Sequence, residues 1–276
     1  MAEAVGPRIL LVEDLPQQRR LIPYRLGPWG VGMATVPDAR GAQDYLRDQT
    51  PDLVLLDVVL PGMDGFSLCR DLKSDPRTCG TAIMMLTELK DNVLHQSQEA
   101  GADDYFPKGA QDLLLRTRVH LHLQLQELRR SGAPVGPGPG NIILATESKA
   151  LRAQLPLEAH MDGHFMRTVE TLEEVRNSCG EEDSLLVVDG ALGINEVAET
   201  LVWLRSQPAT EGIAFLLLCQ ATEISVIPGL LALVDDAAWM PMKPTLARHR
   251  MHLAMELGQR RKAALLAVAP GPDFPF

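Results

Sequence analysis

The sequence predicts an α/β fold made of two doubly wound (βα)5 parallel-sheet domains in tandem. Short apolar runs, typical of parallel strands buried on both faces, alternate with stretches of helical character. The runs of the first half recur in the same order in the second half. A segment rich in proline and glycine, residues 132–140, separates the halves. At 276 residues the chain is long enough for two domains of ordinary size.

Five strands are predicted in the first half, and each is an apolar run followed by a helical stretch. They cover residues 8–13, 31–36, 52–57, 81–87 and 103–107. Leucine spacing then predicts a long helix from Asp112 to Arg130. Because this helix is longer than packing on one sheet requires, we expect its surplus to meet a partner helix in the same chain or in a second molecule.

The second half repeats these strands at nearly constant offsets. Asp189 follows Asp57 by 132 residues, and Lys243 follows Lys108 by 135. The repeated runs cover 141–147, 184–189, 213–219 and 239–244, while the plan is less clear around 156–168. A closing helix is predicted at 245–268. We therefore predict a first domain at 1–131, a linker at 132–140 and a second domain at 141–276.

Polar side chains are predicted to gather where the strands of the first half end. Asp57 ends the third strand, and Glu13-Asp14, Thr87 and Lys108 follow three others. In an open parallel sheet, ligands bind outside the carboxyl ends of the strands. Converging carboxylates need a cation, and oxygen ligands suit Mg²⁺. A lysine and a threonine can bind phosphoryl oxygens, so the pattern indicates a carboxylate that accepts a phosphoryl group.

These residues, with Pro61-Gly62 and Asp103-Asp104-Tyr105, make residues 8–130 resemble a receiver domain of bacterial two-component response regulators. The resemblance implies the CheY-like, flavodoxin-like fold and makes Asp57 the phosphoacceptor. It also implies a histidine kinase or phosphotransfer protein as the phosphoryl donor.

The same resemblance implies the roles of the surrounding residues. Mg²⁺ would be bound by Asp14 and Asp57 directly, by Glu13 through water and by the backbone carbonyl of Val59. Thr87 and Tyr105 would be the switch pair, the hydroxyl moving towards the phosphoryl group and the ring turning inward.

Two positions depart from the family pattern. The lysine is usually followed by proline, but here by Gly109, and the switch threonine is usually followed by a small residue, but here by Glu88. A carboxylate at residue 88 would repel a phosphate or narrow access to it. We expect Asp57 to remain competent, with unusual dephosphorylation kinetics.

The second half has lost part of this pattern. Thr146 replaces the first acid, Cys219 replaces the switch threonine, and Met240 takes the aromatic switch position, while Asp189, Glu147, Lys243 and Pro244 remain. We therefore predict a degenerate receiver-like adaptor domain that is not phosphorylated in normal use.

Charge and composition limit the classes of partner that the chain is expected to bind. The net charge is −10, both halves are acidic, and no cluster of lysine and arginine follows a helix face, which argues against direct nucleic-acid binding. The four cysteines lack metal-ligand spacing. Neither a signal-peptide pattern nor a run of about twenty apolar residues is present, so a cytoplasmic location without membrane contact is expected.

We therefore expect a response regulator, not an enzyme, in which Mg²⁺-dependent phosphorylation of Asp57 controls homodimerisation or binding of an output partner. One alternative is a phosphorylation-independent scaffold, and another is the N-terminal regulatory part of a truncated diguanylate cyclase. An aspartyl-nucleophile hydrolase is disfavoured because Val59 stands where such enzymes carry a second aspartate. A dinucleotide enzyme is disfavoured because no glycine-rich fingerprint follows the first strand.

Overall fold

The computed structural model describes residues 8–27, 32–88, 96–97, 99–110, 112–135, 139–220 and 228–268. The chain divides into two compact units, residues 1–126 and 127–276. The division falls within the last long helix of the first half, ahead of the predicted linker. Part of that linker, residues 136–138, lies outside the described residues, so the predicted domain boundaries stay predictions.

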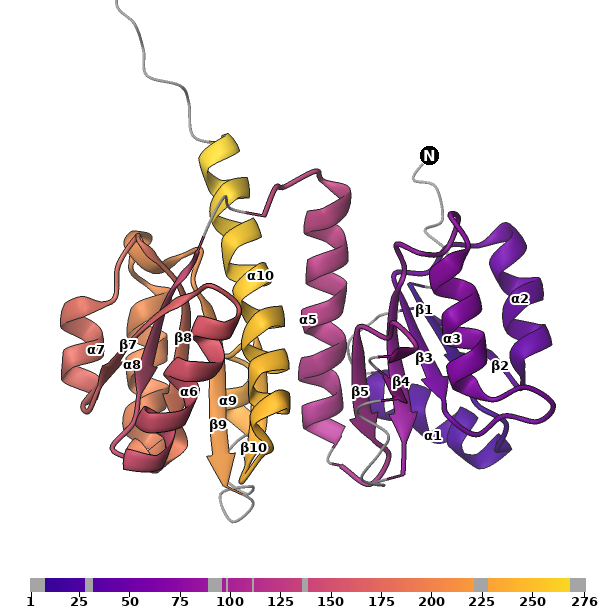
Figure 1. Ribbon diagram of the computed structural model, residues 1–276, viewed down its shortest axis with the longest axis horizontal. Coiled ribbons are helices and arrows are strands. Elements are labelled where there is room, and N and C mark those ends of the chain that lie inside the picture. The colour runs from indigo at the N-terminus through magenta and orange to yellow at the C-terminus, as the bar shows by residue number, and fades with distance from the viewer. Residues whose placement is uncertain are drawn as a thin grey trace, which may run out of the picture. The chain divides into compact units, whose positions relative to one another are not determined.

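The first unit is a five-stranded parallel sheet with helices on both faces (Figure 1). The strand order is β2-β1-β3-β4-β5. The predicted strands are confirmed to within two residues. The elements are β1 (Ile9–Val12), α1 (Pro16–Leu26), β2 (Met33–Val36), α2 (Ala39–Asp48), β3 (Leu53–Asp57), α3 (Gly65–Ser74), β4 (Ala82–Thr87), β5 (Asp104–Pro107) and α5 (Asp112–Arg130).

Strand register brings the predicted site residues to one edge of this sheet. Val12 pairs with Leu56, and Thr87 pairs with Pro107. The polar residues that end or follow these strands therefore lie at the carboxyl edge. The strands β1, β3 and β4 are buried along their whole length, which explains why apolar runs in the sequence mark them.

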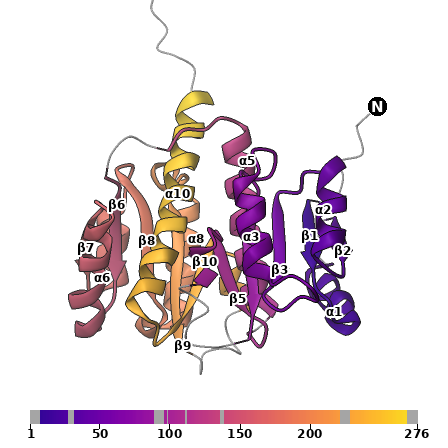
Figure 2. The ribbon, with the colours of Figure 1, turned by 45° about the vertical axis from the view of Figure 1, so that its right-hand side comes forward.

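The second unit has a parallel sheet with the strand order β7-β6-β8-β9-β10, which matches the first sheet strand for strand. In this unit α10 packs across β8 and β9 beside α6 (Figure 2). The region around 156–168, where the sequence pattern is less clear, contains the end of α6 and an edge strand, β7. The elements are β6 (Asn141–Ala145), α6 (Lys149–Met161), β7 (Phe165–Val169), α7 (Leu172–Ser178), β8 (Asp183–Asp189), α8 (Ile194–Arg205), β9 (Ala214–Gln220), α9 (Pro228–Leu231), β10 (Asp236–Met240) and α10 (Pro244–Val268), with short 3-10 helices at Gly190–Leu192 and Pro208–Thr210.

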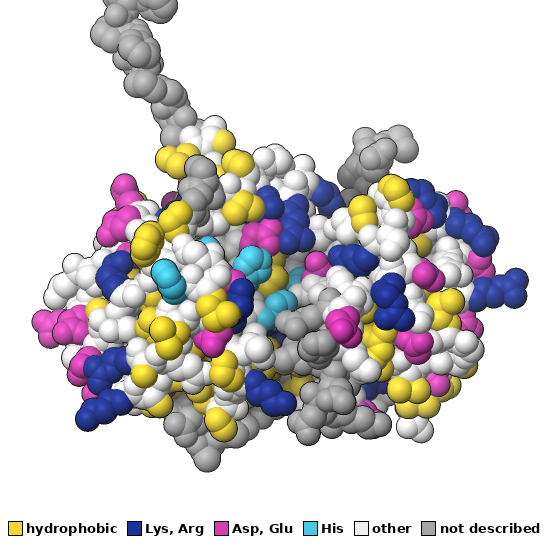
Figure 3. Space-filling model, viewed as in Figure 1, with side chains coloured by type: hydrophobic (Ala, Val, Ile, Leu, Met, Phe, Trp, Pro, Cys, Tyr) yellow, Lys and Arg dark blue, Asp and Glu magenta, His cyan; other side chains and the backbone are white. Residues whose placement is uncertain are grey.

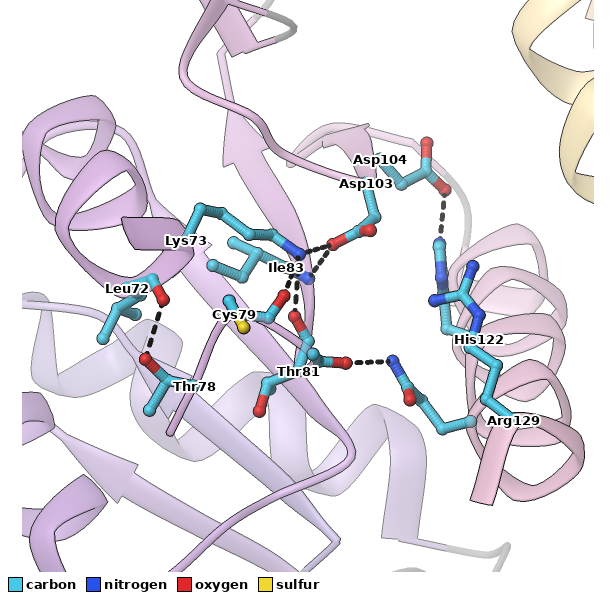
Figure 4. Close-up of polar contacts among 12 residues, drawn as sticks. Leu72, Lys73, Thr78, Cys79, Thr81, Ile83, Asp103, Asp104, His122 and Arg129 are labelled. Carbon is cyan, nitrogen blue, oxygen red and sulfur yellow. Dashed lines mark hydrogen bonds and ion pairs between the residues drawn. The ribbon is translucent and has the colours of Figure 1, made fainter. Parts of the chain in front are cut away.

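A polar contact at the start of β5 ties α3 to the sheet of the first unit (Figure 4). The Asp103 carboxylate lies 2.6 Å from the Lys73 ammonium and accepts a hydrogen bond of 2.7 Å from the Ile83 amide. Lys73 also donates to the Thr81 carbonyl at 2.9 Å. One carboxylate thus joins a helix end, β4 and the entrance to β5.

The second unit contains the same contact 132 residues later. Asp235 lies 2.8 Å from the Arg205 guanidinium and accepts a 2.8 Å hydrogen bond from the Phe215 amide. The next residue of each unit also matches, since Asp104 pairs with Arg118 and Asp236 with Arg250. The internal repeat therefore extends to individual hydrogen bonds and ion pairs.

This register corrects two correspondences that the sequence suggested. Cys219 pairs with Trp239 just as Thr87 pairs with Pro107, so Met240, the last residue of β10, and not Lys243, takes the place of Lys108. The predicted offset of 135 for the lysine is wrong, because pairing along β9 and β10 keeps the offset at 132. Lys243 lies three residues beyond the end of β10.

The aromatic switch position is corrected in the same way. Leu217 pairs with Ala237, as Met85 pairs with Tyr105, so Ala237 and not Met240 takes the place of Tyr105.

The described helices were also compared with the requirements for crossing a bilayer. None of them combines the necessary length with the necessary hydropathy.

Candidate functional site

Three carboxylates meet at the carboxyl edge of the first sheet. Glu13 and Asp14 follow β1, Asp57 ends β3, and their ligand oxygens all lie within 4.8 Å of one another. Glu13 has 0% and Asp57 4% of its surface exposed, whereas Asp14 is half-buried. Asp14 and Asp57 line a hollow of about 310 Å³, to which Val59, Thr87, Glu88 and Lys108 also contribute, while Glu13 lies buried behind it.

Lys108 links two of the three acids. Its Nζ lies 2.7 Å from Asp57 Oδ2 and 2.8 Å from Glu13 Oε2, and its amide donates to the Thr87 carbonyl at 2.8 Å. Burial would lower the pKa of Lys108, but the hydrogen bonds to Asp57 and Glu13 outweigh it and raise that pKa. The lysine is therefore a firmly held cation beside the proposed acceptor.

The single positive charge of Lys108 does not neutralise the negative charges of three carboxylates. Burial raises the pKa of Glu13; the charge of Asp57 raises it further, while Lys108 opposes both. A divalent cation among the three would relieve this repulsion. Since the donors are all oxygens and include more than one carboxylate, the set fits Mg²⁺. The site therefore has the chemistry that a bound magnesium ion needs.

The predicted switch residues occupy different surroundings. Thr87 lines the hollow, and its hydroxyl donates to the Glu88 carbonyl at 2.8 Å. Tyr105 is half-buried against the apolar core of the first unit. The structure thus brings Asp14, Asp57, Thr87 and Lys108 together around one hollow, with Glu13 buried beside Lys108. The inward movement of Tyr105 stays a prediction.

Residues 9–120 match the family model of the response regulator receiver domain. This stretch is a response regulator receiver domain. Its strands and its acidic cluster are those expected from the sequence, and the first unit accordingly belongs to two-component signalling. Val59 lines the hollow, and its amide donates to Asp57 Oδ1 at 3.2 Å; the predicted role of its carbonyl remains a prediction.

Curated relatives cover different parts of the chain. Response regulator PleD of Caulobacter vibrioides is 28% identical over 261 residues, which span 87% of this chain and 57% of PleD. DNA-binding response regulator MtrA of Mycolicibacterium smegmatis is 39% identical over 126 residues, spanning 45% of this chain and 54% of MtrA. The chain thus spans about half the length of the curated relatives it matches.

Two solved receiver domains are similar to part of this chain. The signal receiver domain of a histidine kinase from Syntrophus aciditrophicus is 36% identical, with 43% of this chain and 90% of that chain covered and a TM-score of 0.41. The BeF3-activated N-terminal receiver domain of Klebsiella pneumoniae RstA is 39% identical, with 42% and 97% covered and a TM-score of 0.39.

In the second unit, the counterpart of Asp57 accepts local hydrogen bonds at both of its carboxylate oxygens. Asp189 Oδ2 accepts from the Thr146 hydroxyl at 2.6 Å, and Oδ1 accepts from the Ala191 amide at 3.1 Å. Register places Thr146 where the first unit has Glu13. A hydroxyl therefore meets the aspartate directly where the receiver domain has an acid bridged by lysine.

Sequence reasoning missed Gly65, the first residue of α3. Its amide donates to the Val58 carbonyl at 2.9 Å, and a Cβ built on it would lie 2.1 Å from the Asp57 carbonyl oxygen. Only a residue without a Cβ allows α3 to begin so close to the strand that carries Asp57. A lone glycine at a helix start gives no sequence signal of such an approach.

Replacing Gly65 with alanine is expected to reduce the free energy of unfolding by about 3 kcal/mol, because backbone must shift to admit the methyl group. Urea denaturation of the full chain measures this. Gly80→Ala is the matched control, since no heavy atom lies within 4 Å of a Cβ there. Equal stability of the two variants would contradict the close packing of α3 on β3.

Proposed function

We propose that the receiver domain accepts a phosphoryl group on Asp57 from a histidine kinase or phosphotransfer protein in the presence of Mg²⁺. The observation that carries this proposal is the position of Lys108, which lines an open hollow 2.7 Å from Asp57, within a cluster of three carboxylates. A buried acid that serves only structure does not require two further acids and an open hollow beside it.

Each residue of the site has a separate role in the proposed phosphoryl transfer. An Asp57 oxygen forms the new P–O bond as the P–N bond of a donor phosphohistidine breaks, and the released imidazole takes a proton from solvent. Lys108 balances the charge of a phosphoryl oxygen. Thr87, which lines the hollow, donates its hydroxyl to another once it leaves the Glu88 carbonyl. Mg²⁺, when bound by the acids, supplies further charge neutralisation.

The second unit serves as an adaptor and is not a phosphoacceptor. Support comes from the shared strand order together with the loss of two site residues: Thr146 stands for Glu13, and Met240 stands for Lys108. Phosphorylation of the first unit then controls homodimerisation or binding of an output partner, without enzymatic turnover by this chain.

The proposed partners are proteins, and the protein acts in the cytoplasm. Figure 3 shows lysine and arginine side chains interspersed with aspartate and glutamate on the viewed face of each unit. With a net charge of −10, this pattern lacks the basic footprint that nucleic-acid binding requires. We therefore propose neither nucleic acid nor a membrane surface as a direct partner.

Two alternatives have their own support. The match to PleD runs through both units and covers 57% of that regulator, which favours a regulatory part of a longer protein such as a diguanylate cyclase. Glu88 contributes a further carboxylate to the wall of the hollow, which favours a scaffold that is never phosphorylated.

Beryllofluoride binding to the full chain tests the proposal, with tryptophan and tyrosine fluorescence as the signal and light scattering for mass. Saturable binding that requires Mg²⁺ supports a phosphoacceptor. A concurrent increase in mass supports control of dimerisation, and an unchanged mass supports control of a different partner. Absence of binding contradicts phosphorylation and leaves the scaffold.

Glu88 is expected to slow phosphorylation by small anionic donors. Replacing it with glutamine should raise the rate with acetyl phosphate about threefold, because one negative charge a few ångströms from a phosphate costs somewhat under 1 kcal/mol in water. Glu88→Ala separates size from charge, since only alanine also widens the hollow. If neither variant reacts faster than wild type, or if salt does not reduce the difference, the carboxylate does not repel the donor.

A further inference from the structure

Arg19, on α1, reaches back to the loop that carries two of the three site acids. Its Nη1 donates to the Glu13 carbonyl at 2.8 Å and to the Asp14 carbonyl at 2.6 Å. Long side chains of a helix lean towards its N-terminus, which allows the fourth residue of α1 to reach the preceding loop. One nitrogen thus joins two successive carbonyls of the loop between β1 and α1.

The same loop is also anchored at its start, where the Glu13 amide donates to the Val36 carbonyl at 3.1 Å. Leu15, at the N-cap of α1, makes no side-chain capping hydrogen bond, and Pro16 at the next position has no amide hydrogen. The Leu15 amide donates to Glu13 Oε1 over a long 3.4 Å. The guanidinium therefore supplies the hydrogen bonds to the carbonyls of Glu13 and Asp14, beyond the anchor at the Glu13 amide.

Helix stability does not explain an arginine at this position. The N-terminus of a helix carries partial positive charge, so a cation in its first turns is unfavourable. The first turn of α1 has no acidic residue that would offset Arg19. Among the residues that the structure describes, the Arg19 side chain donates its hydrogen bonds to the two carbonyls of the loop.

We propose that Arg19 is a positioning residue for the divalent cation of this site. It holds the backbone of Glu13 and Asp14 so that their carboxylates stay within 4.8 Å of the Asp57 oxygens. The inference rests on the proposed function, because it assumes that these acids bind a cation. Outer-shell partners of this kind typically contribute about 10- to 100-fold to metal affinity.

Charge and positioning predict opposite results for removal of Arg19. If the guanidinium acted only through its charge, its loss would strengthen cation binding, since it would remove repulsion near the acids. If it positions the acids, its loss weakens binding. The direction of the change in the dissociation constant therefore separates the two.

Mn²⁺ titration of the full chain, followed by the electron paramagnetic resonance of the free ion, tests the inference. Arg19→Gln is expected to raise the Mn²⁺ dissociation constant about tenfold or more. Arg20→Gln is the matched control, because Arg20 is exposed beside Tyr24 and loses the same charge from the same helix. It should bind Mn²⁺ as tightly as wild type or slightly more tightly.

Two further variants keep the result decisive. Arg19→Lys, which keeps the charge and can donate to one carbonyl, should restore part of the affinity. When Asp14 is already replaced by asparagine, Arg19→Gln should reduce Mn²⁺ affinity less than it does in wild type, because both changes act on the same metal ligand. Thermal unfolding without cation shows whether Arg19→Gln is folded, and Arg19→Lys replaces it in the titration if it is not.

The outcomes separate this inference from the proposed function. Saturable Mn²⁺ binding by wild type with equal or tighter binding by Arg19→Gln overturns the positioning role alone. If wild type itself binds no Mn²⁺, the cation site and the proposed phosphoryl transfer fail together, and the positioning role falls with them.

Discussion

Asp57→Asn is expected to abolish both Mg²⁺-dependent beryllofluoride binding and the incorporation of acid-stable, alkali-labile phosphate from acetyl phosphate. Asparagine has nearly the shape of aspartate and keeps an oxygen for the Val59 amide, but it cannot act as the nucleophile. Lys108 would then pair with Glu13 alone. The fold should remain, since one of three mutually repelling carboxylates loses its charge.

Asp189→Asn is the matched control for this prediction, because Asp189 takes the same place in the second sheet. Its carboxylate already accepts hydrogen bonds from Thr146 and Ala191. This variant should bind beryllofluoride as wild type does. Phosphate that remains on Asp57→Asn but is lost on Asp189→Asn would make the second unit the acceptor and reverse the proposed roles.

Lys108→Met is expected to have two opposite effects. Beryllofluoride affinity should fall about tenfold or more, because a charge-assisted hydrogen bond worth roughly 1.5–3 kcal/mol is lost. Divalent-cation affinity should rise, because the ammonium no longer competes for Asp57 and Glu13. Methionine is a suitable replacement, since Met240 occupies the same position in the second unit. Parallel titrations with Mg²⁺ and beryllofluoride measure both effects.

Lys149→Met controls for the loss of one positive charge, since Lys149 is exposed on α6 of the second unit. It should change neither affinity. The pKa of Lys108 is raised, so the lysine stays protonated through the neutral range and the difference from wild type should not vary with pH there. A fall in both affinities of Lys108→Met would indicate general damage to the site, and the proposed division of roles would be wrong.

The fold class and the composition of the site could both be predicted from the order of residues. Parallel strands that are buried on both faces consist almost entirely of apolar residues. Such apolar runs in the sequence correspond to β1, β3 and β4. The carboxyl ends of such strands share one edge of the sheet, so the polar residues that follow them had to lie near one another. For that reason Glu13, Asp57 and Lys108 could be grouped from the sequence alone.

The register of the second unit and the residues that support the site became evident only in the folded chain. Lys243 resembles Lys108 in the sequence, but hydrogen-bonded pairing of β9 with β10 assigns that place to Met240. Arg19 and Gly65 act on carbonyl oxygens of Glu13, Asp14 and Asp57. Every residue has such an oxygen, so these contacts leave no pattern in the order of side chains and appear only when the chain is folded.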